Sequence, residues 1–384
     1  SKCIKAYEDA SFSGTRLPSA KVAGKQSSSD AAIKKAAKLL KASSLPLVSG
    51  LIADVQACRN AVLLAEKING VIDHASGPAM RPNMTVMQRH GKVKTTLAEV
   101  RNRADHVIIF GSKIFESFPR LSDRILFPKK SLGSNGTKNK EIIVIDSTND
   151  CKADIPKRKG ISYLRLEAES LDQLIQRFQL AVTNMADKEK NGDSDKHFTA
   201  ITNKILTKDY TTIIWSSGLL NPASAEQSIQ SITLAIKALM KEVRCVGLPL
   251  GGSKGEITAN NVATWQMGVP LPISFTRGIP DFEPVINCGQ SLLKNNEVDT
   301  LLWISTYNPE DIPPKTKARI ILIGHPKMKV PRSIDVFIPI GIPGIDHSGL
   351  ACRTDSVATL PLRKLRDSNL LAASEVLEKI TELV

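Results

Sequence analysis

The residue types that suggest chemistry lie most densely between residues 251 and 284 of this 384-residue chain. The stretch contains a Trp-Gln pair ending at Gln266 and one arginine, Arg277, in an Arg-Gly turn. Two glycines at its start, Gly251 and Gly252, allow the backbone to approach a ligand or another chain closely. From residue 260 onward the sequence has neither a two-residue nor a 3.6-residue period. Its proline and glycine positions predict an extended, partly buried loop.

Two Asp-His pairs, Asp73–His74 and Asp346–His347, follow segments that are typical of strands. Either pair could belong to a site, although a structural role at a strand end is the favoured interpretation. The six histidines have no metal-ligand spacing, and the six cysteines are scattered without a Cys-x-x-Cys motif. This pattern supports neither a disulfide framework nor a zinc or iron–sulfur site.

Motifs for the common nucleotide cofactors are also absent from the sequence. No Gly-x-Gly-x-x-Gly motif follows the first predicted strand, and no P-loop motif occurs. Ordinary dinucleotide and P-loop functions therefore lose their main support. Because no complete catalytic set is visible, no catalytic residue is predicted.

The chain is basic, with Lys and Arg exceeding Asp and Glu by 14. Such a surplus could attract nucleic acid, an anionic cofactor or an acidic partner, or could simply keep the surface solvated. Aromatic residues make up only 4% of the chain, and no nucleic-acid-binding signature is present, so no nucleic-acid partner is expected. No apolar run approaches the ~20 residues of a membrane helix, and no signal region is visible. A cytoplasmic protein without membrane contact is therefore predicted.

Apolar runs that do not alternate with polar residues indicate a parallel sheet covered by helices on both faces. In the first part of the chain such strands are predicted at residues 45–52, 70–73, 106–110, 141–146 and 161–166. After a polar stretch the order of events repeats, with strands predicted at residues 211–218, 299–305, 319–324 and 335–340. The repetition predicts an α/β fold of two similar, doubly wound, mainly parallel-sheet halves.

The same pattern predicts domain boundaries. Residues 1–28 predict an irregular N-terminal arm, and residues 29–186 a first α/β domain. A polar linker over residues 187–197 leads to a second α/β domain over residues 198–345. Residues 346–384 predict a return strand and a C-terminal helix, whose apolar face is expected to dock on its own domain.

Three stretches together resemble the B subunit of formylmethanofuran dehydrogenase, which belongs to the molybdopterin oxidoreductase superfamily. The first covers residues 50–73 and 91–111 and includes KTTLAEVRNRADHVIIFG, the second is residues 251–284, and the third, residues 349–362, reads GLACRTDSVATLPL. Residues 99–105 and 264–266 are their most specific parts. The resemblance implies the superfamily's fold, in agreement with the predicted halves.

The sequence differs from the redox-active family at the positions that hold that family's iron–sulfur cluster and metal. The family carries a cysteine-rich N-terminal segment for an iron–sulfur cluster, and Cys3 is the only possible remnant here. The family also places a Cys and then a His before Gly-Pro, and that Cys ligates molybdenum or tungsten. Aligned on Gly77–Pro78, these positions hold Ala75 and Ser76. A methyl group cannot replace a thiolate, and Ser76 could offer an oxygen only if the register shifts by one.

The resemblance therefore implies that molybdopterin, metal and the iron–sulfur cluster have been lost, and that the fold is cofactor-less. Arg277 resembles the arginine that the active family places beside its substrate. Its role here is either anion binding or, as the favoured interpretation, hydrogen bonding to loop carbonyls. Four other residues resemble the surroundings of the pterin pocket and are vestigial candidates for cofactor binding: Gly251, Gly252, Asn261 and Gln266.

This combination resembles the B subunit of the formyltransferase/hydrolase complex of aerobic methylotrophic bacteria. The resemblance implies a non-catalytic structural subunit of a complex that moves formyl from formyl-tetrahydromethanopterin to a methanofuran-type carrier and releases formate. Its partners would be the sister subunits, and the positive surplus could attract the acidic tail of the carrier. The alternative is a redox-active B subunit of formylmethanofuran dehydrogenase with molybdopterin.

Overall fold

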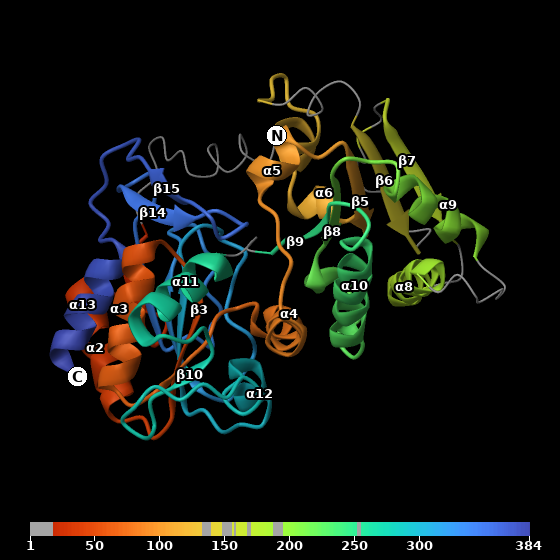
Figure 1. Cartoon of the computed structure of the whole chain (residues 1–384). Helices are drawn as coiled ribbons and strands as arrows, with labels where there is room; N and C mark the ends of the chain where they lie inside the picture. Colours follow the sequence, from red (N-terminus) through yellow and green to blue (C-terminus); the bar gives the residue numbers. More distant parts are fainter. Residues whose placement is uncertain are drawn as a thin grey trace. The chain divides into compact units, whose positions relative to one another are not determined.

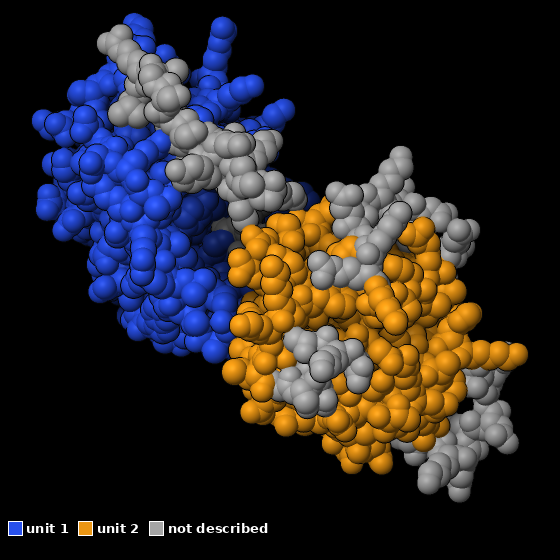
Figure 2. Space-filling view, turned by 90° about the horizontal axis from the view of Figure 1, so that it is seen from above, with its two compact units in different colours: residues 1–78, 254–384 blue, residues 79–253 orange. Residues whose placement is uncertain are grey.

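The computed structural model describes residues 18–132, 140–147, 156, 159–166, 170–186, 195–251 and 255–384. The chain forms two compact units, which Figure 2 colours separately. Unit 1 consists of residues 1–78 and 254–384, and unit 2 of residues 79–253. Within the described ranges, no helix is both long and apolar enough to cross a membrane.

Unit 1 is built on an eight-stranded sheet with the order β10-β4-β3-β11-β12-β13-β1-β2. Its five central strands are parallel: β4 (Val71–Ile72), β3 (Pro46–Ile52), β11 (Thr300–Ser305), β12 (Arg319–Gly324) and β13 (Val336–Pro339). Short antiparallel strands complete the edges: β10 (Ile273–Ser274), β1 (Ala20–Val22) and β2 (Lys25–Ser27). A separate antiparallel pair follows later in the chain, β14 (Gly349–Cys352) and β15 (Thr359–Leu362).

The two faces of this sheet are covered differently. One face packs against α2 (Ser29–Lys41), α3 (Val55–Lys67), α11 (Glu256–Met267) and α13 (Ala373–Leu383), which form one core with alternate residues of the strands. In Figure 1, α2, α3 and α13 lie side by side on this face. The opposite face carries the short helix α12 (Gly289–Lys294) and loops. The C-terminal helix therefore docks on its own unit, as predicted from its apolar face.

Unit 2 has a five-stranded, wholly parallel sheet with the order β7-β6-β5-β8-β9. The strands are β5 (His106–Phe110), β6 (Glu141–Asp146), β7 (Ile161–Arg165), β8 (Thr211–Trp215) and β9 (Cys245–Pro249). One face packs against α8 (Leu171–Ala186), α9 (Lys196–Ile205) and α10 (Ala225–Leu239), and the other against α5 (Leu97–Asn102), α6 (Ile114–Ser117) and the π-helix η1 (Ser122–Leu126). The remaining helices are α4 (Gly77–His90) and the 3₁₀ turn η2 (Ser217–Leu219).

The predicted α/β fold with mainly parallel sheets agrees with the structure, but the predicted division into contiguous halves does not. Strand β3 pairs with β11 in unit 1, whereas in unit 2 β5 pairs with β8, which joins β5, β6 and β7 to β8 and β9 in one sheet. Each sheet thus combines strands from both halves of the sequence. The parallel cores nevertheless share one order, because β4-β3-β11-β12-β13 corresponds strand by strand to β9-β8-β5-β6-β7.

Three further predictions about segments are corrected. The predicted irregular arm contains the strand pair β1–β2, whose first strand extends the sheet beside β13. The predicted return strand is β15, and it pairs with β14 rather than with a large sheet. The stretch predicted as a loop begins with the helix α11, because its small and apolar residues pack on α3 and β3. Residues 1–17 and most of the predicted linker, residues 187–194, lie outside the described residues.

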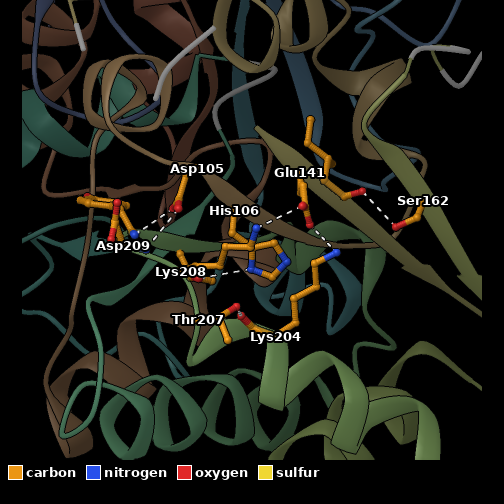
Figure 3. A network of polar contacts seen from close by, with 11 residues as sticks. Asp105, His106, Glu141, Ser162, Lys204, Thr207, Lys208 and Asp209 are labelled. Carbon is orange, nitrogen blue, oxygen red and sulfur yellow. Dashed lines mark hydrogen bonds and ion pairs between the residues drawn. The ribbon is translucent and has the colours of Figure 1, made fainter. Parts of the chain in front are cut away.

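A polar network occupies the amino-terminal edge of the sheet in unit 2 (Figure 3). Glu141 forms ion pairs with Lys204 and, at 3.1 Å, with Lys208. His106 is fully buried, and its Nδ1 lies 3.2 Å from Thr211 Oγ1. Burial, followed by the charges of Lys208 and Lys204, lowers the pKa of His106 to about 4. Because parallel α/β sheets bind ligands at the opposite, carboxyl edge, this network is structural.

The buried His106 is expected to make unit 2 sensitive to acid. Its pKa is about 4 in the folded protein and about 6.5 when unfolded, so the unfolded chain binds the proton first as the pH falls. Stability should fall by about 2 kcal/mol between pH 7 and pH 4.5 through this group alone. Urea denaturation should show this loss in the wild type and a shallower slope in His106→Gln. An equal slope in both would contradict it, and exposed His197→Gln is the matched control.

Candidate functional site

A cleft of about 730 Å³ opens in unit 1 at the carboxyl end of β4, and we call it the β4 cleft. His74, in the turn after β4, and Ser49 of β3 form its floor. Its walls consist of Ala75, Trp303 of β11, the helix α12 and residues 310–315. The carboxyl ends of parallel strands are the usual place for ligands in such folds, and the volume is that of a small-molecule pocket.

The floor is held in place by Asp73, which is 1% exposed. One oxygen of its carboxyl group, Oδ1, accepts a hydrogen bond from the backbone N–H of His74 at 2.8 Å. The other, Oδ2, accepts one at 2.9 Å from Gly289 at the start of α12. Burial raises the pKa of Asp73 to about 7. This side chain therefore ties the end of β4 to a helix more than 200 residues later in the chain.

Two glycines fit closely around the same carboxyl group. A Cβ atom on Gly77 would lie 2.8 Å from Asp73 Oδ2, and one on Gly289 would lie 3.2 Å from Asp73 Cβ. Only a residue without a side chain can pass at these distances. The Gly-Pro pair on which the resemblance was aligned thus has a packing reason in this chain.

His74 lies in the turn after β4, lines the cleft and is 3% exposed. Its Nδ1 accepts a hydrogen bond from the backbone N–H of Ser76 at 3.1 Å. Because Nδ1 is an acceptor, the neutral ring carries its proton on Nε2. Burial lowers the pKa of His74 to about 4, so the ring is neutral at physiological pH.

Ala75 occupies the wall of the same cleft. Its backbone N–H donates to the carbonyl oxygen of Gly50 at 3.0 Å, and its side chain offers the cleft only a methyl group. Its correspondence with the ligating Cys of the family stays a prediction. Within the described residues, no group of three or more His, Cys, Asp or Glu side chains is placed to hold a metal ion. A methyl group at position 75 has no atom that could ligate a metal.

The structure does not bring the other predicted site residues to this cleft. Arg277 is exposed and has no hydrogen bond or ion pair to any described residue, so its interpretation as a brace for loop carbonyls loses its support. Asn261 Oδ1 accepts from Ser356 Oγ at 2.9 Å. Gln266 Oε1 is buried without a partner among the described residues.

Gly251 and Gly252, at the start of residues 251–284, do not contribute to the β4 cleft. Gly251 belongs to unit 2, where a Cβ atom would lie 3.4 Å from Met80 Sδ. Gly252 lies outside the described residues. No nucleophile elbow was expected from the sequence, but residues 251–255 do have the Gly-x-Ser-x-Gly spacing of that motif. Because residues 252–254 lie outside the described ranges, that spacing supports no site.

The first Asp-His pair follows the end of β4, as predicted, whereas the second lies in the turn between β13 and β14. In the second pair, Asp346 is almost fully buried, accepts a hydrogen bond from the Ile342 N–H at 2.8 Å and pairs with Arg366 Nε at 2.6 Å. His347 Nδ1 lies 2.9 Å from the carbonyl oxygen of Ser348. These contacts give Asp346 a structural role, whereas His74 of the first pair faces the β4 cleft. The cysteines Cys58, Cys245, Cys288 and Cys352 are free thiols, and Cys3 and Cys151 lie outside the described residues.

The sequence analysis missed Ser49 in β3 and Trp303 in β11, which line the cleft. Ser49 interrupts an otherwise apolar strand, and a polar residue at a buried strand position is a usable signal. The lysines on the rim, Lys294 and Lys315, left no pattern that distinguishes them from other surface lysines.

Sequence comparisons identify relatives across most of the chain. The B subunit of the tungsten-containing formylmethanofuran dehydrogenase 2 of Methanococcus maripaludis is 24% identical over 366 residues, covering 92% of this chain and 83% of the relative. The corresponding protein of Methanocaldococcus jannaschii is 26% identical over 348 residues, covering 88% and 79%. The chain is a distant homologue of these B subunits. No protein-family model matches the chain.

A third relative belongs to a different complex. The B subunit of the formyltransferase/hydrolase complex of Methylorubrum extorquens is 24% identical over 322 residues, covering 83% of this chain and 84% of the relative. The solved structure of that complex with methylofuran contains a chain that matches with a TM-score of 0.78 and 21% identity, covering 95% of this chain and 98% of that one. At this identity the structural likeness shows a shared fold.

Proposed function

We propose that this chain is a non-catalytic structural subunit, homologous to the B subunits, in a formyltransferase/hydrolase complex of one-carbon metabolism. In that complex, formyl would pass from formyl-tetrahydromethanopterin to a methanofuran-type carrier, and formate would be released. Homology to both kinds of B subunit and the full-length likeness of fold support membership of such a complex. The sister subunits would carry the catalytic sites.

The observation that carries the proposal is Ala75 at the wall of the β4 cleft. The relatives named as tungsten-containing dehydrogenases and the relative from the formyltransferase/hydrolase complex are equally distant, so identity alone does not choose between them. The lack of a metal-ligating atom at position 75 favours the formyltransferase/hydrolase complex. A position aligned with a ligating thiolate holds a methyl group, which has no atom to offer a metal.

The proposal is tested by deleting the gene in the native host and assaying formyl transfer and formate release in extracts. Loss of both activities together with loss of the assembled complex is expected. Re-expression of the wild type and of Ala75→Ser should restore both to similar levels, because residue 75 would have no chemical role. Retention of formyl transfer without the chain would contradict a structural role, and strong dependence on residue 75 would contradict a non-catalytic one.

The alternative function is that of a redox-active B subunit of formylmethanofuran dehydrogenase with molybdopterin. It is favoured by the names of two relatives, which are tungsten-containing enzymes. It requires a metal ligand other than residue 75. Formate- or formylmethanofuran-dependent reduction of a viologen dye by the isolated complex would support it over the structural proposal.

The positive surplus of 14 charges is expected to assist binding of an acidic carrier to the complex. The acidic tail of a methanofuran-type carrier would be attracted over a range that salt shortens. Affinity for the carrier should therefore fall several-fold between low and physiological ionic strength, measured by isothermal titration calorimetry. An affinity that does not change with salt would remove the electrostatic contribution.

A further inference from the structure

The floor of the β4 cleft contains two buried side chains, His74 and Ser49, that each have one polar atom without a partner among the described residues. His74 is 3% exposed, and Ser76 N–H is the only partner of its ring nitrogens. Ser49 is 5% exposed, and its Oγ makes no hydrogen bond to a described residue. Neither His74 Nε2 nor Ser49 Oγ is among the fully buried polar atoms that lack a partner, so both atoms are open to the cleft and available to a ligand that enters it.

The hydrogen bonds around His74 and Ser49 determine whether their free atoms act as donors or acceptors. The Ser76 N–H occupies His74 Nδ1, so Nε2 carries the proton and acts as a donor. The hydroxyl of Ser49 can donate as well. Both residues line the same cleft. Ser49 lies on the same face of β3 as Leu47, which belongs to the core on the α12 side of the sheet. The floor therefore presents two neutral donors, which suit an oxygen acceptor.

The charged residues near the cleft floor indicate whether the oxygen acceptor of the ligand is neutral or anionic. The described residues that line the floor include no cation, and the residue next to His74 is the buried carboxyl group of Asp73. Placing a carboxylate there would bury a negative charge without a positive partner, which is costly. A neutral carbonyl oxygen needs no such partner, so it fits the floor better than an anion.

The walls and the rim describe the rest of the ligand. Trp303 is 7% exposed and is held by a 3.0 Å hydrogen bond from its Nε1 to the carbonyl oxygen of Asp311. Ile312 and Pro314 continue this apolar wall. The rim carries both signs of charge, with Lys294 and Lys315 beside Glu310, so it selects neither anions nor cations.

We propose that the β4 cleft binds a neutral carbonyl compound with a flat apolar body, such as an aromatic amide. Its carbonyl oxygen accepts hydrogen bonds from His74 Nε2 and Ser49 Oγ, and its body packs on Trp303 and Ile312. This binding site is independent of the structural role proposed above, because neither the partners nor the reaction of a complex enters the argument.

Benzamide and benzoate are the probes, because they have the same size and differ in charge. Binding to the full chain, alone or in its native complex, is followed by the ¹⁵N signals of labelled histidines. In the free protein His74 should show a protonated Nε2 and an unprotonated Nδ1. Benzamide should shift the His74 signal and bind in the millimolar range, and benzoate should bind at least about tenfold more weakly.

Variants assign the effect to the cleft floor. Ser49→Ala removes a hydroxyl without a protein partner, so it should fold normally and weaken benzamide binding about three- to tenfold. His74→Gln should weaken it further. His197→Gln, at an exposed position in unit 2, is the control and should bind as the wild type does.

Three outcomes would overturn the proposal. Tighter binding of benzoate than of benzamide would contradict the neutral class of ligand. An unshifted His74 signal with both probes would remove the site. Equal affinity in Ser49→Ala and the wild type would mean that the hydroxyl is not a donor to the ligand, even if His74→Gln failed to fold.

Discussion

Replacing Asp73 with alanine is expected to lower the free energy of unfolding by about 3 kcal/mol. The substitution leaves two backbone donors, the N–H groups of His74 and Gly289, buried without an acceptor. An unsatisfied buried donor costs about 1 to 3 kcal/mol. The loss should appear as a lower urea midpoint with an unchanged slope, followed by circular dichroism.

The control for this variant is Asp367→Ala. Asp367 has a fully exposed side chain in an ion pair with Lys364, so its removal should leave the stability almost unchanged. The β4 cleft should also loosen in Asp73→Ala, because the carboxyl group connects β4 to α12. Similar midpoints for the two variants would show that Asp73 does not hold this part of the fold.

The second large effect is expected from Arg366→Met. Arg366 Nε lies 2.6 Å from Asp346 Oδ1, and the side chain of Asp346 is only 1% exposed. Removing the cation leaves the carboxylate buried, with the Ile342 N–H as its remaining described donor. Breaking a buried pair in this way costs about 3 to 5 kcal/mol, and partial exposure of Arg366 places the expected loss near the lower limit.

The double variant Arg366→Met/Asp346→Leu separates the loss of the pair from the cost of the stranded charge. It should recover part of the stability, because an apolar pair buries no unpaired carboxylate. Thermal denaturation of the four proteins of this cycle measures the coupling. A single variant Arg366→Met as stable as the wild type would mean that Asp346 finds another cation or remains solvated.

The strands of this fold could be predicted from sequence because their signal is local. Each buried parallel strand is a short apolar run, and every strand predicted in the two large sheets is present. The helix α11 was missed because buried residues occur at consecutive positions, from Thr258 to Asn260 and again at Val262 and Ala263. Burial on several sides removes the 3.6-residue stripe that identifies a surface helix.

The division of the chain into units could not be predicted from local pattern. It depends on the pairing of β3 with β11, which joins segments about 250 residues apart. The sequence of an apolar strand does not identify the strand with which it pairs. Two domains that are each contiguous in sequence were therefore the simpler prediction. The two-unit arrangement requires the chain to return to unit 1 after completing unit 2.

The candidate site was only partly predictable for the same reason. The resemblance directed attention to Ala75 and its neighbours, and the structure places Ala75 on a cleft wall. The donor role of His74 depends on the Ser76 N–H and on a clamp between Asp73 and Gly289, 216 residues later. Arg277, which resembles the arginine that the active family places beside its substrate, is exposed and does not line that cleft.

The central claim, that this chain is a metal-free structural subunit, is tested most directly by the metal and pterin content of its native complex. The complex would be isolated from the native host through a tag on this chain. Molybdenum and tungsten would be measured by mass spectrometry and pterin by fluorescence after oxidation. We expect formyltransferase and hydrolase chains in the complex, with molybdenum, tungsten and pterin far below one per chain. Near-stoichiometric metal and pterin would contradict the claim and would mean that a ligand other than residue 75 completes a redox site.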